Sequence, residues 1–189
     1  MERRPVLYLI ASGASPAREL PALIASLADD WDTCVITTPE GARFFDIARI
    51  ASATGHPVRT SFKDPDAPDV LPPASAFAAA PATFNTINKW AAGISDTLAL
   101  ALLNEAVGLG RPIVTVPWPN VALARHPAFG HSISTLRACG IKVILDLENL
   151  PADDRPARFP WAELRTELAR VRADLTGDGA YHPPRTLPL

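Results

Sequence analysis

The sequence predicts one α/β domain built on a doubly wound parallel sheet. Short, continuously apolar segments such as residues 6–11 and 112–116 are typical of strands that are buried on both faces. Between these segments lie stretches with apolar residues at helical spacing, so strands and helices alternate along the chain. A length of 189 residues suits a single domain. We therefore expect a three-layer sandwich of the Rossmann-like or flavodoxin-like kind.

The elements follow in a regular order. Thr38-Pro39 predicts the start of the second helix, and Gly55 predicts its end. Five prolines make residues 56–73 a long loop, and loops of this length are often functional. We expect residues 1–175 to form the domain and residues 176–189 to form a proline-rich C-terminal tail. The expected strands are 6–11, 33–37, 74–80, 112–116 and 141–145, and the expected helices are 20–27, 38–55, 83–93, 97–108, 131–139 and 161–175.

Composition excludes several classes of function. With 18 basic and 20 acidic residues the net charge is −2, which offers no strong field for nucleic acid or an anionic membrane. No apolar run approaches the ~18 residues of a membrane span. The two cysteines, Cys34 and Cys139, are far apart in sequence and predict neither a disulfide framework nor a metal site. We expect a cytoplasmic protein in which Cys139 is a buried, inert thiol.

Three turns that follow predicted strands carry the candidate binding residues. In the first, Ser12 and Gly13 are small, and Ser15 precedes a proline; in the second, Thr38 precedes a proline. A hydroxyl residue before proline is typical of a helix start, whose free N–H groups favour a phosphate. Plain helix capping is the alternative for each turn. Neither GxGxxG nor a P-loop is present.

The third turn gathers more polar groups than one cap needs. Thr83, Asn85, Thr86 and Asn88 lie at the start of a predicted helix, and Lys89 follows. An asparagine carboxamide both donates and accepts hydrogen bonds, which suits the edge of a heterocycle such as a flavin. A network of capping bonds is the alternative.

Residues 81–96 also resemble a known family. Pro-Ala-Thr-Phe-Asn-Thr at 81–86, followed by Gly-Ile-Ser-Asp at 93–96, is similar to a segment of the homo-oligomeric flavin-containing cysteine decarboxylases. These include phosphopantothenoylcysteine decarboxylase and the lantibiotic peptidyl-cysteine decarboxylases. The turn from Thr38 to Phe44 resembles the family's Thr-x-x-Ala-x-x-Phe, with Gly41 in place of alanine. The order of strands fits from residue 5 to about residue 145.

The resemblance implies FMN as cofactor and a trimer, or a dodecamer of trimers, with FMN near a subunit interface. It implies a thiol substrate, either a small molecule or a peptide. It places Ser12, Gly13 and Thr38 at the phosphate, and Thr83, Asn85 and Thr86 at the ring and ribityl chain. Ser15 and Phe44 complete the expected cofactor-binding set, and Asn120 is the expected substrate-binding residue.

The chain departs from the family where catalysis is expected. The family's histidine, about fourteen residues before the Pro-Ala-Thr segment, corresponds to Ala67, and the nearest histidine is His56. The clamp Pro-x-Met-Asn-x-x-Met-Trp keeps only its proline and its asparagine, which is Asn120. The flap region at 146–158 has no cysteine. His126 or His131 could supply an acid–base group, the alternative being a surface or capping role. The catalytic residues therefore stay unassigned.

Three functions remain open. The first is an FMN-dependent oxidative decarboxylase, in which the flavin accepts two electrons from a thiol to give a thioaldehyde that loses CO2. The second is a non-catalytic FMN-binding module with a regulatory or interaction role. The third is a protein that binds another phosphorylated ligand on the same scaffold, as in the related flavin prenyltransferases.

Overall fold

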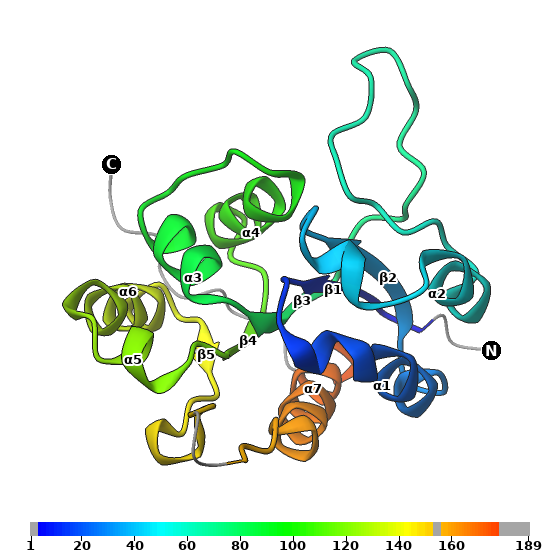
Figure 1. Cartoon of the computed structure of the whole chain (residues 1–189). Helices are drawn as coiled ribbons and strands as arrows, with labels where there is room; N and C mark the ends of the chain where they lie inside the picture. Colours follow the sequence, from blue (N-terminus) through cyan, green and yellow to red (C-terminus); the bar gives the residue numbers. More distant parts are fainter. Residues whose placement is uncertain (1–3, 153–155, 178–189) are drawn as a thin grey trace.

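A five-stranded sheet forms the centre of the computed structural model, which describes residues 4–152 and 156–177 (Figure 1). The strand order is β2-β1-β3-β4-β5, and every neighbouring pair is parallel. This confirms the predicted fold class. The strands are β1 (Val6–Ala11), β2 (Asp32–Thr37), β3 (Ala76–Ala82), β4 (Ile113–Pro117) and β5 (Lys142–Val143).

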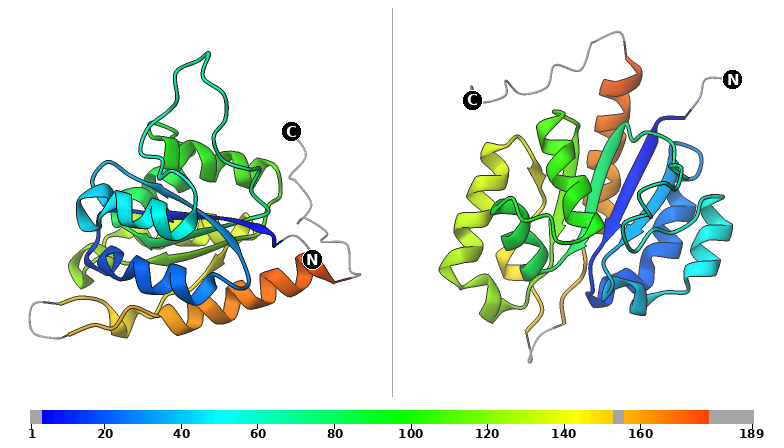
Figure 2. Two further views of the ribbon diagram at one scale, coloured as in Figure 1. Left: turned by 90° about the vertical axis from the view of Figure 1, so that its right-hand side faces the viewer. Right: turned by 90° about the horizontal axis from the view of Figure 1, so that it is seen from above.

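Helices cover both faces of this sheet (Figure 2). Each face has its own apolar core, one packed under α1, α2 and α7 and the other under α3, α4 and α6. The short helix α5 leads into α6. The helices are α1 (Leu20–Leu27), α2 (Ile47–Thr54), α3 (Phe84–Ala91), α4 (Leu98–Gly108), α5 (Val121–Ala124), α6 (Pro127–Ala138) and α7 (Trp161–Thr176).

Strand β1 shows why the central strands are apolar throughout. Leu7 and Leu9 point into the first core, whereas Tyr8 and Ile10 point into the second. All six residues of β1 are buried, because a central strand between two helical layers has no face in water. Burial of each large apolar side chain contributes roughly 1.5–3 kcal/mol.

The prediction of one continuous second helix over residues 38–55 is wrong. A 3-10 helix occupies Gly41–Phe44, Phe45 is extended with φ −148°, and α2 begins only at Ile47. The cause is Asp46, whose carboxylate accepts hydrogen bonds from the N–H groups of Ala48 and Arg49 and so starts a new helix. The predicted end is correct, because Gly55 adopts φ 73°.

Three further expectations need correction. Ser15 does not cap a helix, because it is the first residue of the 3-10 helix Ser15–Glu19 and its side chain makes no capping bond. Helix α6 begins four residues early, where Nδ1 of His126 accepts from the N–H of Ala128 at 3.1 Å. Cys139 is exposed at the end of that helix, and the buried thiol is Cys34. The predicted tail lies outside the described residues from residue 178 onward.

The predicted loop at 56–73 is irregular in the structure and arches away from the sheet (Figure 2). It begins beside β2, where Arg59 forms an isolated bridge with Ile36. Among residues 4–152 and 156–177, no helix has both the length and the apolar character that crossing a membrane requires.

Candidate functional site

A cavity of about 560 Å³ opens at the carboxyl edge of the sheet. It lies where the chain leaves β1 in one direction and β3 in the other, the position at which doubly wound sheets bind ligands. The turns after β1, β2, β3 and β4 and the start of α4 line it. We call it the first cavity.

The turn after β1 lets a bound group come close to the main chain. The N–H of Ser12 donates to the carbonyl of Pro81 at 2.9 Å, which ties the ends of β1 and β3 together. A Cβ atom on Gly13 would lie 3.0 Å from Cβ of Glu40, so only glycine fits without displacing the next turn. Among the described residues the N–H of Gly13 has no acceptor. It is therefore available to a bound group.

The turn after β2 is equally tight. The N–H of Thr38 donates to the carbonyl of Ala11 at 3.0 Å, and Oγ1 of Thr38 accepts from the N–H of Gly41 at 3.1 Å. Since that oxygen accepts a bond from the main chain, its own proton can donate into the cavity. A Cβ atom on Gly41 would lie 2.3 Å from Oγ1 of Thr37 and 2.7 Å from the Ala11 carbonyl oxygen.

The turn after β3 holds a chain of three hydroxyl groups. Oγ of the buried Ser12 lies 2.9 Å from Oγ1 of Thr86, which lies 3.0 Å from Oγ1 of Thr83. Thr83 also caps α3, accepting from the N–H of Thr86 at 3.3 Å. The residues that cap α3 therefore also form a wall of the cavity. Helix capping and ligand binding at this turn do not exclude each other.

The two asparagines of α3 differ in their surroundings. Asn85 is exposed and lines the first cavity, and no described residue forms a hydrogen bond with its side chain. Oδ1 of Asn88 accepts from the hydroxyl of Ser132 at 2.7 Å and so joins α3 to α6. Of these two asparagines, Asn85 is the one that offers a free carboxamide to the cavity.

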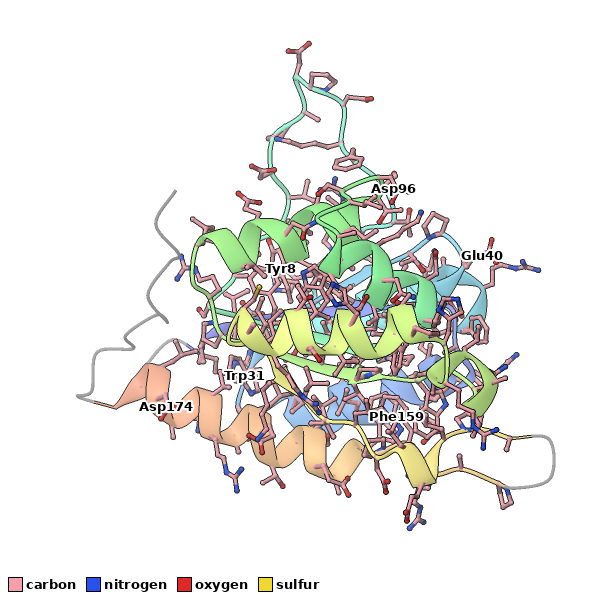
Figure 3. All side chains as sticks on the ribbon, turned by 90° about the vertical axis from the view of Figure 1, so that its left-hand side faces the viewer. Tyr8, Trp31, Glu40, Asp96, Phe159 and Asp174 are labelled. Atoms are coloured by element: carbon pink, nitrogen blue, oxygen red, sulfur yellow. The ribbon has the colours of Figure 1, made fainter. Side chains whose placement is uncertain are left out.

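The charged residues of the cavity wall are paired. Lys89 forms an ion pair with Asp96, and Glu40 pairs with Arg43 at 3.0 Å. Figure 3 shows Glu40 and Asp96 toward the same end of the molecule. Neither Glu40 nor Asp96 is a predicted site residue, although Asp96 belongs to the Gly-Ile-Ser-Asp segment that could have pointed to it.

The turn after β4 closes the far side of the cavity. Trp118 and Pro119 line it as apolar groups, and Trp118 packs edge-on against Phe159 with ring centroids 5.0 Å apart. Oδ1 of Asn120 accepts from the N–H of Leu123 at 2.8 Å. Asn120 therefore caps α5, and its NH2 group has no acceptor among the described residues.

The structure brings most of the predicted site residues together. Ser12 lies behind the wall, where it bonds Thr86, while Ser15 and Phe44 are not part of the lining. Phe44 packs on the core, with the guanidinium of Arg18 5.4 Å from its ring centroid. The predicted site residues that line the first cavity are Gly13, Thr38, Thr83, Asn85, Thr86 and Asn120.

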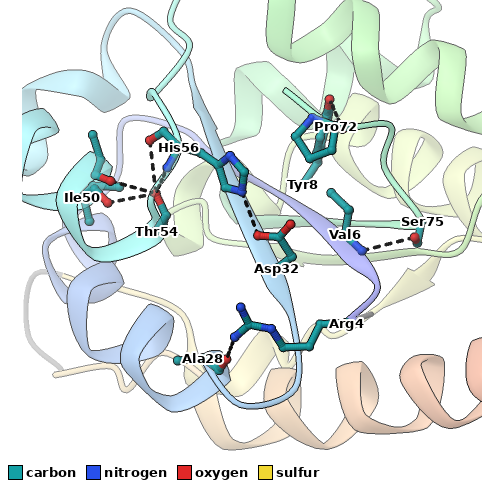
Figure 4. Close-up of polar contacts among 11 residues, drawn as sticks. Arg4, Val6, Tyr8, Ala28, Asp32, Ile50, Thr54, His56, Pro72 and Ser75 are labelled. Carbon is teal, nitrogen blue, oxygen red and sulfur yellow. Dashed lines mark hydrogen bonds and ion pairs between the residues drawn. The ribbon is translucent and has the colours of Figure 1, made fainter. Parts of the chain in front are cut away.

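None of the histidines considered earlier enters the lining. Nε2 of His56 lies 2.7 Å from Oδ1 of Asp32, at the opposite edge of the sheet (Figure 4). His126 caps α6 and packs edge-on against Phe84, with centroids 5.8 Å apart, and His131 is exposed on α6. Within the described ranges, neither histidine nor cysteine lines the first cavity, and no three His, Cys, Asp or Glu residues gather as a metal site.

Comparisons with known proteins identify a family and related folds. The sequence model of the family described as Flavoprotein matches residues 1–168. No curated protein matches the chain in sequence. A PPC decarboxylase mutant complexed with pantothenoylaminoethenethiol superposes with a TM-score of 0.73 at 19% identity, covering 89% of this chain and 98% of that one.

Two further solved structures share the fold. The FMN-dependent cysteine decarboxylase TvaF from thioviridamide biosynthesis has a TM-score of 0.71 at 22% identity and covers 90% of this chain and 99% of that one. The FMN-binding protein AtHal3 has a TM-score of 0.71 at 18% identity, with 93% and 100% covered. At these identities the likeness shows the fold.

Proposed function

The chain belongs to the flavoprotein family, and we propose that it binds FMN in the first cavity. A volume of about 560 Å³ lies within the roughly 300–1,000 Å³ typical of cofactor sites. The observation that carries the proposal is the convergence of free donors and small residues from the turns after β1, β2 and β3 at the switch point of the sheet.

The phosphate fits between the turns after β1 and β2. The free N–H of Gly13 and the hydroxyl proton of Thr38 are both donors there, and the missing Cβ of Gly13 lets an anion approach the main chain. Glu40 lies at the same place and forms an exposed ion pair with Arg43 at 3.0 Å. Main-chain and hydroxyl donors, rather than a basic side chain, would hold the anion.

The ring fits between α3 and the turn after β4. The carboxamide of Asn85 can pair with the polar edge of the flavin, since it both donates and accepts. Leu100 and Trp118 offer apolar walls, and both are buried in the protein. This arrangement of one polar side and two apolar walls is typical of sites for planar cofactors.

Bound FMN would supply the two-electron acceptor. We propose oxidative decarboxylation of a thiol-bearing carboxylic acid, small or peptidic, as the reaction. The free NH2 group of Asn120 would donate to the substrate carboxylate and so orient it. We also propose that the active form is a homo-oligomer, such as a trimer.

A non-catalytic FMN-binding module is the second candidate, and the cavity wall favours it. Its titratable residues are Glu40, Lys89 and Asp96 among those described, and each is held in an ion pair. General acid–base catalysis needs a group that is free to exchange a proton with the substrate. A module of this kind would bind the cofactor without turnover.

One experiment tests the binding and separates the two candidates. The purified protein is titrated with FMN, and its visible spectrum is recorded; it is then mixed without oxygen with peptides that end in cysteine. Bleaching with release of CO2 supports the decarboxylase, and a yellow protein that none of them bleaches supports the module. If the purified wild-type protein takes up no FMN, both candidates are contradicted.

A further inference from the structure

A second cavity, of about 640 Å³, lies on the face of the sheet that α4 covers. There the strands β1 and β2 are covered by the loop at 56–73 instead of a second helix, and the cavity remains between this loop and α4. Helix α4 separates the two cavities, since Thr97 and Leu100 line the first one. The apolar lining of the second cavity includes Tyr8, Ile36, Phe62, Leu71, Leu98 and Leu102.

Hydrogen bonds at both ends of the loop hold this cavity open. At the start, the N–H of Arg59 donates to the carbonyl of Val35 at 3.1 Å, and its carbonyl accepts from Thr37 at 2.9 Å. At the end, the hydroxyl of Tyr8 donates to the carbonyl of Pro72 at 2.9 Å (Figure 4). The loop is therefore fixed to β1 and β2 instead of filling the space.

A further pair holds the loop to itself. Nζ of Lys63 lies 3.0 Å from Oδ1 of Asp69 and donates to the carbonyl of Ala67 at 2.7 Å. These charges are mutually neutralised. They shape the rim of the cavity and leave the recognition of a ligand to other groups.

Two charged side chains in the lining have no partner of opposite charge among the described residues. The half-buried Arg59 donates from Nη2 to the carbonyl of Ser61 at 3.1 Å, and its other guanidinium donors are free. Glu105 stands on the opposite wall, on α4. Arg59 and Glu105 both line the second cavity, so they face the same space. The cavity thus offers one cation and one anion above an apolar floor.

We propose that this second cavity binds a small zwitterion with an apolar body, of the amino-acid class. The carboxylate would pair with Arg59, whose planar guanidinium suits bidentate contact, and the ammonium would pair with Glu105. The apolar side chain would lie against Leu98 and Leu102. A ligand with one charge leaves the opposite charge of the site without a partner.

The test uses L-phenylalanine as the probe, with L-phenylalaninamide and 3-phenylpropionate as single-charge analogues. Binding to the intact protein is measured by calorimetry, without FMN. We expect L-phenylalanine to bind about tenfold or more tightly than either analogue, because each lost charge-assisted hydrogen bond changes affinity by that order. Arg59→Gln should abolish the preference over the amide, and Glu105→Gln the preference over the acid.

The matched control is Arg49→Gln, which removes an exposed arginine on α2. FMN titration of each variant reports on the first cavity, which neither Arg59 nor Glu105 lines. The proposal is overturned if L-phenylalanine produces no binding heat at millimolar concentration. It is also overturned if Arg59→Gln and Arg49→Gln bind the three probes alike. Neither outcome depends on whether the protein takes up FMN.

Discussion

Replacing Gly41 by alanine tests the tight contact between the first two turns. The new Cβ atom would lie 2.3 Å from Oγ1 of Thr37 and 2.7 Å from the carbonyl oxygen of Ala11. The second neighbour is main chain of a central strand and cannot rotate away, so the turn itself must move. Overpacking of a buried site costs about 1–3 kcal/mol, and we expect the upper end of that range.

This loss should be visible in unfolding. A loss of about 3 kcal/mol corresponds to a fall of roughly 6–12 °C in Tm for a chain of this length. The free energy of unfolding is measured in urea at one protein concentration, with Trp fluorescence as the signal. Gly130→Ala is the control, because nothing lies within 4 Å of a Cβ there and the residue is inside α6. It should stabilise the protein by roughly 0.5–1 kcal/mol.

The reasoning fails if Gly41→Ala is as stable as the wild type. The same contact accounts for a departure noted in the sequence, since the resembled family has alanine at this position. Here the hydroxyl of Thr37 fills the space that such a Cβ would take, and it donates to the Ala11 carbonyl at 3.1 Å.

Three other predictions concern the cavities and the core. Asn85→Ala should weaken FMN binding by about 1–3 kcal/mol in a fluorescence titration, because a ring-edge hydrogen bond is lost; an unchanged Kd would remove Asn85 from the site. Thr38→Val should weaken FMN more than riboflavin, and equal losses would contradict a phosphate contact. Burial raises the pKa of Tyr8 from 10.0 to about 12, so stability from its neutral form is complete below pH 10 and is lost as pH rises toward 12. Tyr8→Phe should flatten that alkaline fall in urea titrations, and an unaltered slope would contradict the assignment.

The fold was predictable because the strands are apolar on both faces. In β1 the full run from Val6 to Ala11 is buried, and so are all seven residues of β3. The break at Phe45 was not predicted, since the apolar residues on both sides of it continue at helical spacing. Only the capping bonds of Asp46, which need the folded turn, show where α2 begins.

The site was predictable where turn chemistry and resemblance coincide. Thr83 and Asn85 were selected because polar residues gather after a buried strand, and both line the first cavity. Ser15 was selected as a hydroxyl residue before a proline and Phe44 through the resembled turn, but both belong to 3-10 helices and neither lines the first cavity. The sequence indicates a functional loop at 56–73 but does not predict the second cavity, because the cavity depends on where that loop crosses the sheet.

The three hydroxyls of Ser12, Thr86 and Thr83 can form a directed relay at the cavity wall. Ser12 is 1% exposed, and its hydroxyl lies within hydrogen-bond distance of the Thr86 hydroxyl. With Ser12 as the donor to Thr86, Thr86 donates to Thr83, which also accepts from the main chain. In this arrangement the last proton points outward, and a ligand in the first cavity meets a donor at Thr83 whose orientation depends on Ser12, 71 residues earlier in the sequence.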